Sequence, residues 1–228
     1  MKILAVSALT AAVIMSACAD PAANKPKAQT TAPITNVAAN TNAAAKPAGE
    51  SSSVLAGFKA TGSELAVTPE NSKVEFTGSK ISGKHDGGFK TFKGIIDLVG
   101  EKPESSLVLI EIDVASVFTD ADGLTKHLQT GDFFETEKFP KASFVSTKIE
   151  PPPGGNGNYN VTGDLEIRSV KKSVTFPATI RVTPEVVSVI AEFSINRKDF
   201  SIAYPGKADD LIRDDVIIRL ELKPARVK

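Results

Sequence analysis

The side chains that could carry chemistry are few, and their number limits the reactions available. The 228-residue chain has one cysteine, Cys18, and two histidines, His85 and His127. One thiol cannot form an internal disulfide or a cysteine-based zinc cluster, and two imidazoles cannot form an all-histidine metal site. His85 lies in a predicted turn and His127 on a short predicted helix. Either could hydrogen-bond a ligand head group, although a surface histidine is the simpler interpretation.

Acidic side chains cluster before the last predicted strand, where they could hold a hard cation. Basic residues lie among them, so we favour a solvated turn held by ion pairs and predict no metal site. The chain also lacks a nucleophile elbow, a phosphate-binding glycine loop and an acid pair at fixed spacing. We therefore predict no catalytic residue and no enzyme. The carboxylates are Asp199, Asp209, Asp210, Asp214 and Asp215, and the basic neighbours are Arg197, Lys207 and Arg213.

The overall charge is balanced, with 27 basic and 27 acidic residues and a formal net charge of zero. A protein that binds nucleic acid through its phosphates normally carries an excess of Lys and Arg. We therefore expect no nucleic-acid partner.

Residues 1–17 have the features of an export signal. Met1 and Lys2 precede an uncharged apolar run, Ile3 to Met15, which is too short to cross a hydrocarbon core of ~30 Å. The sequence Met15-Ser16-Ala17-Cys18 resembles the lipobox of bacterial lipoproteins, in which the cysteine is acylated and becomes the mature N-terminus. The resemblance implies a lipoprotein anchored through Cys18 by acyl chains such as palmitate, on the periplasmic side of a bacterial membrane, the outer membrane being favoured over the inner. An ordinary signal peptide with an incidental cysteine is the alternative.

Residues 18–63 are expected to be the lipidated cysteine followed by a disordered tether. From Ala19 to Ser53 the chain consists mainly of Ala, Pro, Asn, Thr, Ser and Lys, with Ile34 and Val37 as its only large apolar residues. Such a segment buries too little apolar surface to offset the loss of chain entropy. Residues 64–228 then form the folded domain.

The folded domain shows apolar residues at every second position, the pattern of half-buried strands. In one segment Val108, Ile110 and Ile112 alternate with Leu109 and Glu111, which places Glu111 on the outer face. Eight such strands need to curl on themselves to cover their apolar face, which predicts an all-β, eight-stranded antiparallel barrel. An outer-membrane barrel would need aromatic girdles, but the chain has no Trp and two Tyr. The predicted strands are residues 73–76, 94–98, 108–114, 142–144, 161–168, 174–182, 187–195 and 216–223.

The alternation breaks between Phe118 and Pro140. Thr119 or Asp120 can cap a short helix that runs to Gln129, and several apolar side chains fall on one side of it or just after it. This helical insertion should cover one end of the barrel, either as a plug or as the wall of a ligand site. The apolar residues are Leu124, Leu128, Phe133, Phe134 and Phe139.

Several segments resemble the YceI-like family in order and spacing. The most specific are HLQTGDFF at 127–134 and KFPKASF at 138–144. Further matches are GGFKTFKG at 87–94, VTGDLEI at 161–167 with Lys171 and Lys172, and INRKDF at 195–200. The sequence departs from the family at Arg168-Ser169-Val170, where a glycine is common in the turn.

The resemblance implies a lipocalin-like barrel with an elongated apolar pocket that in some members holds a polyisoprenoid chain such as a quinone tail. We therefore expect a membrane-tethered protein that binds or carries an amphiphile with a long apolar tail, namely a polyisoprenoid, an isoprenoid quinone or a lipid. The alternative is a stress-linked structural or interaction module with a packed barrel and no ligand. Pairing of two chains into a homodimer stays open. The residues predicted to contact the tail are Ile96, Leu98, Val108, Ile110, Ile112, Leu128, Phe133, Phe134, Phe176, Phe193, Ile218 and Leu220.

Overall fold

The structure is a computed structural model that describes residues 19–33, 53–152 and 157–226. The strands are β1 (Gln29–Thr31), β2 (Ser63–Val67), β3 (Ser72–Lys80), β4 (Gly83–Phe89), β5 (Phe92–Leu98), β6 (Leu107–Asp113), β7 (Val117–Thr119), β8 (Lys141–Glu150), β9 (Asn158–Ile167), β10 (Val170–Val182), β11 (Val187–Asn196), β12 (Gly206–Lys207), β13 (Asp210–Leu211) and β14 (Asp215–Leu222). The helices are α1 (Asp122–Leu128) and three 3₁₀ turns, η1 (Pro103–Ser105), η2 (Val114–Ser116) and η3 (Arg197–Phe200).

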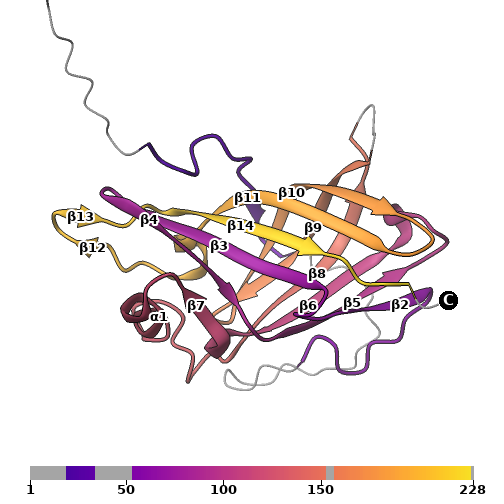
Figure 1. The fold of residues 1–228 in the computed structure, drawn as a ribbon, viewed down its shortest axis with the longest axis horizontal. Coiled ribbons are helices and arrows are strands. Elements are labelled where there is room, and N and C mark those ends of the chain that lie inside the picture. The colour runs from indigo at the N-terminus through magenta and orange to yellow at the C-terminus, as the bar shows by residue number, and fades with distance from the viewer. Residues whose placement is uncertain (1–18, 34–52, 153–156, 227–228) are drawn as a thin grey trace, which may run out of the picture.

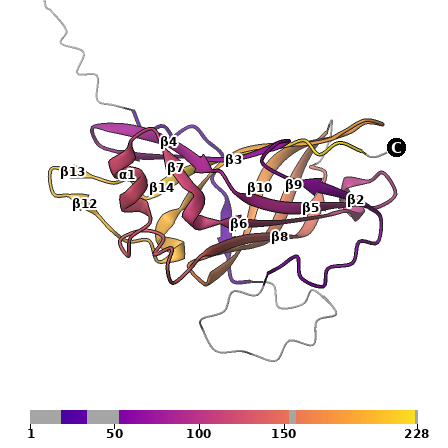
Figure 2. The same ribbon diagram turned by 60° about the horizontal axis from the view of Figure 1, so that its bottom comes forward.

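Twelve of these strands form one antiparallel sheet. Its order is β2-β5-β6-β8-β9-β10-β11-β14-β3-β4-β7, with β1 beside β10, while β12 and β13 form a separate hairpin. The sheet curls on itself into a half-barrel (Figures 1 and 2). The all-β antiparallel prediction is confirmed, and the eight predicted strands correspond to β3, β5, β6, β8, β9, β10, β11 and β14. The sheet has more strands than predicted because β1, β2, β4 and β7 are short or poor in large apolar residues.

The inward-facing side chains fill one end of the half-barrel. Ile96, Leu98 and Val108 on β5 and β6 are only 2%, 3% and 7% exposed. They pack in one core cluster with Val161 of β9 and Ile180 of β10. This end of the barrel is therefore a packed core, as in barrels small enough to be filled by side chains.

The outer face of β5 and β6 is covered as well, which the alternation pattern does not show. Glu111 on that face is only 4% exposed, and its carboxylate lies 3.5 Å from the Lys93 ammonium and 3.7 Å from that of Lys141. Burial raises the pKa of Glu111, but a hydrogen bond from Ser53 and the two ammonium groups outweigh it, so the pKa lies below its ordinary value. Asp97 nearby accepts hydrogen bonds from the Thr61 hydroxyl and backbone. Glu111 is therefore not a solvent-exposed side chain.

Part of the predicted tether is folded against the barrel. β10 and β11 pair directly only from Thr179↔Ile190 to Val182↔Val187. Beyond that point they separate, and the N-terminal segment fills the gap between them, with β1 paired to residues 173–175 of β10. On the other side Ser194 of β11 donates to Pro26 O and accepts from Ala28 N, both at 2.8 Å.

The prediction of a disordered tether is therefore wrong for residues 19–33, and also for residues 53–63, where Ser53 and Thr61 hydrogen-bond to Glu111 and Asp97 and β2 begins at Ser63. Ala28 is 6% exposed and belongs to the barrel core, and Lys25 and Lys27 pair with Glu192 and Asp215. The segment docks through backbone hydrogen bonds, ion pairs and the small side chains of Ala22 and Ala28, so its shortage of large apolar residues did not prevent folding. Cys18 and the export signal lie outside the described residues.

The predicted helical insertion is present as α1, which begins at Asp122 and ends at Leu128. Neither Thr119 nor Asp120 caps the helix, whose N-cap residue is Ala121, but the Thr119 hydroxyl contacts Ala121 O and the Thr125 hydroxyl, at 2.8 and 2.9 Å. Of the helices the structure describes, none has the length and apolarity to cross a membrane.

Candidate ligand-binding cavity

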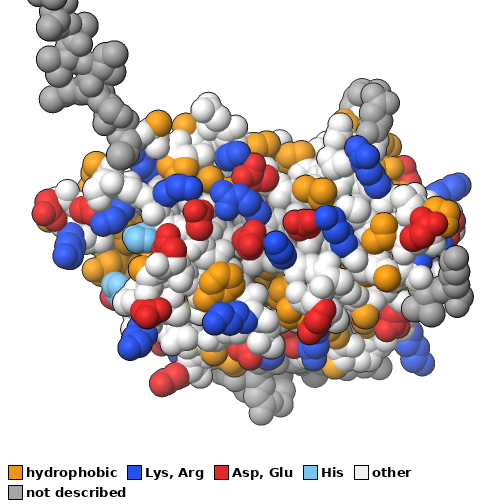
Figure 3. Space-filling model, viewed as in Figure 1, with side chains coloured by type: hydrophobic (Ala, Val, Ile, Leu, Met, Phe, Trp, Pro, Cys, Tyr) orange, Lys and Arg blue, Asp and Glu red, His pale blue; other side chains and the backbone are white. Residues whose placement is uncertain are grey.

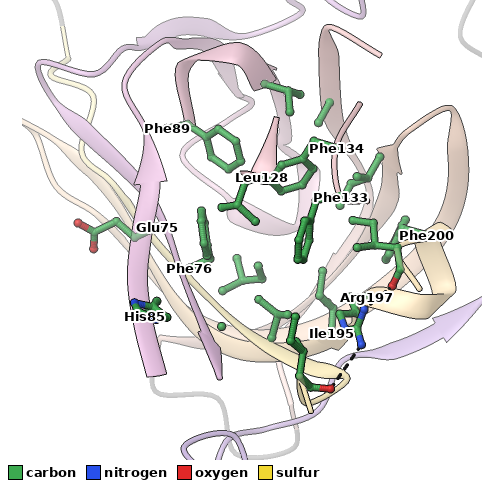
Figure 4. A pocket seen from close by; sticks show the side chains of 18 of the residues that line it. Glu75, Phe76, His85, Phe89, Leu128, Phe133, Phe134, Ile195, Arg197 and Phe200 are labelled. Carbon is green, nitrogen blue, oxygen red and sulfur yellow. Dashed lines mark hydrogen bonds between the residues drawn. The ribbon is translucent and has the colours of Figure 1, made fainter. Parts of the chain in front are cut away.

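The half-barrel is hollow at the end beside α1. A cavity of about 490 Å³ lies between the inner face of the sheet, α1 and the chain between β11 and β14. Figure 4 shows its labelled side chains, most of them aromatic or aliphatic and directed toward a common space. This volume lies in the usual range for small-molecule sites, about 300–1,000 Å³.

Nine of the twelve residues predicted to contact a tail line this cavity. Six come from strands β6, β10, β11 and β14, and three from α1 and the loop that follows it. The other three, Ile96, Leu98 and Val108, lie in the packed end of the barrel and do not reach the cavity. The nine that line it are Ile110, Ile112, Leu128, Phe133, Phe134, Phe176, Phe193, Ile218 and Leu220.

Aromatic rings form the boundary between the hollow and the packed end. The rings of Phe176 and Phe193 stack with centroids 4.0 Å apart, and Phe144 packs on Phe176 at 5.7 Å. Gly163 on β9 leaves room for Phe144, because a Cβ there would lie 2.4 Å from the ring. Along β10 the cavity contacts Val174 and Phe176, and the next inward residue, Ala178, belongs only to the core. The three rings therefore form the floor of the cavity.

The mouth is shaped by α1 and the loop after it. The His127 ring packs edge-on against Phe133, at 5.0 Å between centroids, and against Tyr204, at 5.1 Å. Its Nε2 lies 2.7 Å from Asp132 Oδ2, so that carboxylate fixes the orientation of the imidazole. Phe134 completes the wall beside Phe89, with ring centroids 6.0 Å apart. The helical insertion is therefore a wall of the cavity and not a plug that fills it.

Arg197, which the sequence predicted only as an ion-pair partner of the C-terminal carboxylates, is also a cavity residue. It is 5% exposed, and its guanidinium donates to Arg213 O, Ile202 O and Ile212 O and to the Asp214 carboxylate. One of its hydrogen bonds is drawn in Figure 4. Because these bonds occupy its donors, Arg197 holds the chain between β11 and β14 in place rather than presenting a charge to the cavity. That chain contributes further apolar lining: Phe200, Ile202, Tyr204 and Ile212.

Ionisable side chains of the described lining gather at the mouth. His85 lies on β4, not in a turn as predicted, and its Nδ1 lies 2.8 Å from Asp120 Oδ1. Lys80 pairs with Asp210, and Lys207 lies next to them on β12. Glu75 is directed away from the cavity (Figure 4). The site thus combines an apolar interior with hydrogen-bonding groups at one end, the arrangement that suits a ligand with an apolar tail and a polar head.

Three of the five C-terminal carboxylates, Asp210, Asp214 and Asp215, are engaged in ion pairs. Asp214 contacts Arg197 at 3.1 Å and Lys198 at 2.8 Å, in agreement with the predicted ion-paired turn. Asp210 instead pairs with Lys80, and hydrogen bonds from Lys80 and Ser82 lower its pKa to about 2. Within the described ranges no group of three or more His, Cys, Asp and Glu side chains is placed to hold a metal ion.

Comparison with known proteins gives consistent results. Residues 65–223 match the YceI-like domain family. A UPF0312 protein of Pseudomonas putida is 32% identical over 138 residues, which cover 58% of this chain and 71% of that protein. The crystal structure of Burkholderia cenocepacia BcnA superposes with a TM-score of 0.63 at 26% identity, covering 69% of this chain and 98% of that one. A polyisoprenoid binding domain from Saccharophagus degradans, implicated in plant cell wall breakdown, has the same fold, with a TM-score of 0.57 at 16% identity over 72% of this chain and 99% of that one.

Proposed function

This chain belongs to the YceI-like family, and from that premise we propose that it is a membrane-tethered periplasmic protein that binds and carries an amphiphile with a long apolar tail. A polyisoprenoid, an isoprenoid quinone or a lipid has the required chemistry. The observation that carries the proposal is the cavity itself, which is apolar along its length, closed by aromatic rings at one end and lined by polar side chains at the other.

The cavity favours a ligand that enters tail first. Phe144, Phe176 and Phe193 close the deep end, so a chain can pass in from the side of α1 and the β12–β13 hairpin. Burying each CH₂ group contributes about 0.8 kcal/mol, whereas association costs an estimated 4–15 kcal/mol. A short chain should therefore bind poorly, and a tail long enough to reach the floor should bind well.

The polar mouth can then hold the head group. At the mouth the Tyr204 hydroxyl can donate and accept hydrogen bonds, and His127 and His85, each with one ring nitrogen against a carboxylate, leave the other ring nitrogen for a head group. A neutral or anionic oxygen of a quinone, hydroxyl or phosphate head would be suited to such groups. The fold that this chain shares with a polyisoprenoid binding domain is in keeping with a prenyl tail.

The tethering part of the proposal depends on Cys18. The lipobox-like sequence Met15-Ser16-Ala17-Cys18 supports acylation of that thiol, and several acyl chains hold a protein on a membrane durably where one does not. The folded chain then faces the periplasm. We favour the outer membrane as the membrane that holds the anchor.

The direct test is to identify what the cavity holds in cells. The protein is purified from its native membrane, extracted with organic solvent, and the extract is analysed by mass spectrometry beside an extract of an Ile112→Trp variant, whose cavity is narrowed. We expect a stoichiometric amphiphile in the first extract and much less in the second. Equal amounts of the same lipids in both, at sub-stoichiometric levels, would favour a module that carries no ligand.

A further inference from the structure

Two exposed apolar side chains lie together at the tips of two hairpins. Ile81, in the turn between β3 and β4, is 54% exposed, and Leu211 of β13 is 45% exposed. The Ile81 amide donates to Leu211 O at 3.1 Å, so the two tips are in contact. Of the described residues, the other large hydrophobic residue exposed to this degree is Ile190 on β11, at 48%.

This pair sits at the rim of the cavity mouth. Lys80, which precedes Ile81, and Gly206, Lys207 and Asp210 of the β12–β13 hairpin all line the cavity. Figure 1 shows the β3–β4 turn, the β12–β13 hairpin and α1 at one end of the molecule, opposite the end that carries β2. On the face drawn in Figure 3, both histidines and several basic side chains lie toward that same end.

Basic side chains flank the exposed apolar pair. The two tips, residues 80–84 and 206–213, contain Lys80, Lys84, Lys207 and Arg213. Of these, Lys80, Lys84 and Arg213 pair with Asp210, Asp86 and Asp20. Apolar side chains flanked by Lys and Arg are suited to a bilayer surface, where the former enter the interface and the latter meet anionic head groups.

The docked N-terminal segment starts at this same end. Asp20 Oδ2 lies 3.5 Å from the guanidinium of Arg213, and the Arg213 amide donates to Ser79 O at 2.9 Å, one residue before Lys80. Cys18 precedes Asp20 by two residues, which can span at most ~7 Å of extended chain. An anchor on Cys18 would therefore be attached beside the mouth and not at the end of a long spacer.

We propose that the tips carrying Ile81 and Leu211 are a membrane-docking surface, which holds the cavity mouth against the bilayer to which the chain is anchored. The inference rests on the lipid anchor of the proposed function and adds the orientation of the cavity. A tail can then pass between bilayer and cavity without crossing water. The exposed pair is too small for a stable protein interface, which usually buries about 800 Å² on each partner.

The absence of tryptophan from the chain makes a direct test practical. Ile81→Trp, Leu211→Trp and, as matched control, Ile190→Trp each give a single-tryptophan protein with the reporter at an exposed isoleucine or leucine. The full lipidated proteins are reconstituted into phosphatidylethanolamine–phosphatidylglycerol vesicles that contain lipids brominated on the acyl chain. We expect the brominated lipids to quench the tryptophan fluorescence at least twofold at positions 81 and 211. The emission at these two positions should also shift to the blue, and the tryptophan at position 190 should change little. Lys207→Glu should weaken quenching at position 211, and Lys102→Glu, on the exposed turn between β5 and β6, should not.

The outcomes separate the inference from its premise. Flotation of all three proteins with the vesicles, but with equal and weak quenching, would overturn the docking surface and leave the anchor intact. Failure to float would refute the lipid anchor, and the inference with it. A blue shift at position 211 that grows with protein concentration in the absence of vesicles would assign the tips to contact between two copies and also overturn the proposal.

Discussion

Phe176 on β10 and Phe193 on β11 stack face to face, with ring centroids 4.0 Å apart and planes 8° from parallel, although their strands have already separated at this level. The N-terminal segment fills the backbone gap between the same two strands, where β1 pairs with residues 173–175. The rings thus tie together two strands that do not hydrogen-bond to each other there. They also divide the barrel interior into a packed and a hollow part.

Because these two rings form part of the cavity floor, a substitution in one of them should change the depth of the cavity. Phe193→Leu removes one stacked ring, and we expect the cavity to accept a tail longer by one or two carbons. The variant should lose about 1–3 kcal/mol of unfolding free energy, since large-to-small substitutions in a core lose transfer free energy and leave a void. Affinities for an acyl or prenyl series, measured by titration, would show the optimum length move upward. An unchanged optimum would show that the tail does not reach the floor.

Narrowing the cavity should have the opposite effect. Ile112 lines the cavity from β6, whereas Ile190 faces outward from β11 and is 48% exposed. Ile112→Trp should lower affinity for long tails at least tenfold while costing about 1–3 kcal/mol of stability, a typical value for overpacking. Ile190→Trp places the same side chain outside and should leave affinity unchanged. Equal affinities of the two variants for a long tail would exclude this cavity as the binding site.

The sequence predicted the walls of the cavity but not its extent. Ile96 and Ile110 show the same alternation on neighbouring strands, yet only Ile110 reaches the hollow end. The difference arises from which side chains meet across the barrel, in particular the rings of Phe144, Phe176 and Phe193. These contacts depend on strand register. Alternation gives the face of a side chain and not its level along the barrel.

Two other features depend on interactions that a pattern of apolar residues does not reveal. The segment around Ala28 docks mainly through backbone hydrogen bonds to Ser194, and Arg197 is buried because carbonyls and Asp214 occupy its donors. Both sets of interactions join elements that are distant in the sequence. By contrast α1 was predicted because its apolar spacing and its break from the strand alternation are local properties of the chain.

The turn between β9 and β10 is strained in this chain. Arg168 and Ser169 have φ angles of 52° and 58°, the left-handed conformation that the turn requires and glycine adopts most easily. Arg168 gains compensation from Glu135 at 3.0 Å and from Ser201 O at 2.8 Å. Ser169→Gly should therefore raise the unfolding free energy by about 0.5–1 kcal/mol, visible as a higher urea midpoint. Arg168→Gly should gain less or lose stability, because it removes those contacts; a larger gain at position 168 than at 169 would contradict this account.

The ion pair at the mouth predicts an acid-sensitive contact. Asp210 has its pKa lowered to about 2, first by the hydrogen bond from Lys80 and then by those from Ser82, from an ordinary value of 3.8. A carboxyl with a lowered pKa stabilises the folded chain fully above its ordinary pKa, and this contribution is lost as the pH falls from about 4 toward 2. Titration of the Asp210 carboxyl by NMR should therefore show a midpoint near 2. Lys80→Met should raise that midpoint. The ammonium group of Lys84 pairs with Asp86 instead, so Lys84→Met should leave the midpoint unchanged.

Membrane attachment is tested at the thiol. Cys18→Ser removes the only cysteine in the chain. We expect the variant to accumulate as an unprocessed precursor or to be released when membranes are washed with high salt, whereas the wild-type protein stays bound. Immunoblots of washed membranes and supernatants would measure the distribution. A variant that is processed normally and still resists washing would contradict a lipid anchor at this position.

The docked N-terminal segment can be released by one buried charge. Ala28 is 6% exposed within the barrel core, and Ala23 is exposed on the same segment. A carboxylate cannot be buried unpaired at position 28 without a cost of several kcal/mol, so Ala28→Asp should undock the segment rather than retain the contact. The Ser194 amide, which donates to Pro26 O at 2.8 Å, would then lose its partner. Hydrogen exchange at Ser194 should accelerate at least tenfold in Ala28→Asp and stay slow in Ala23→Asp, and equal protection in both variants would show that the segment does not hold the gap between β10 and β11.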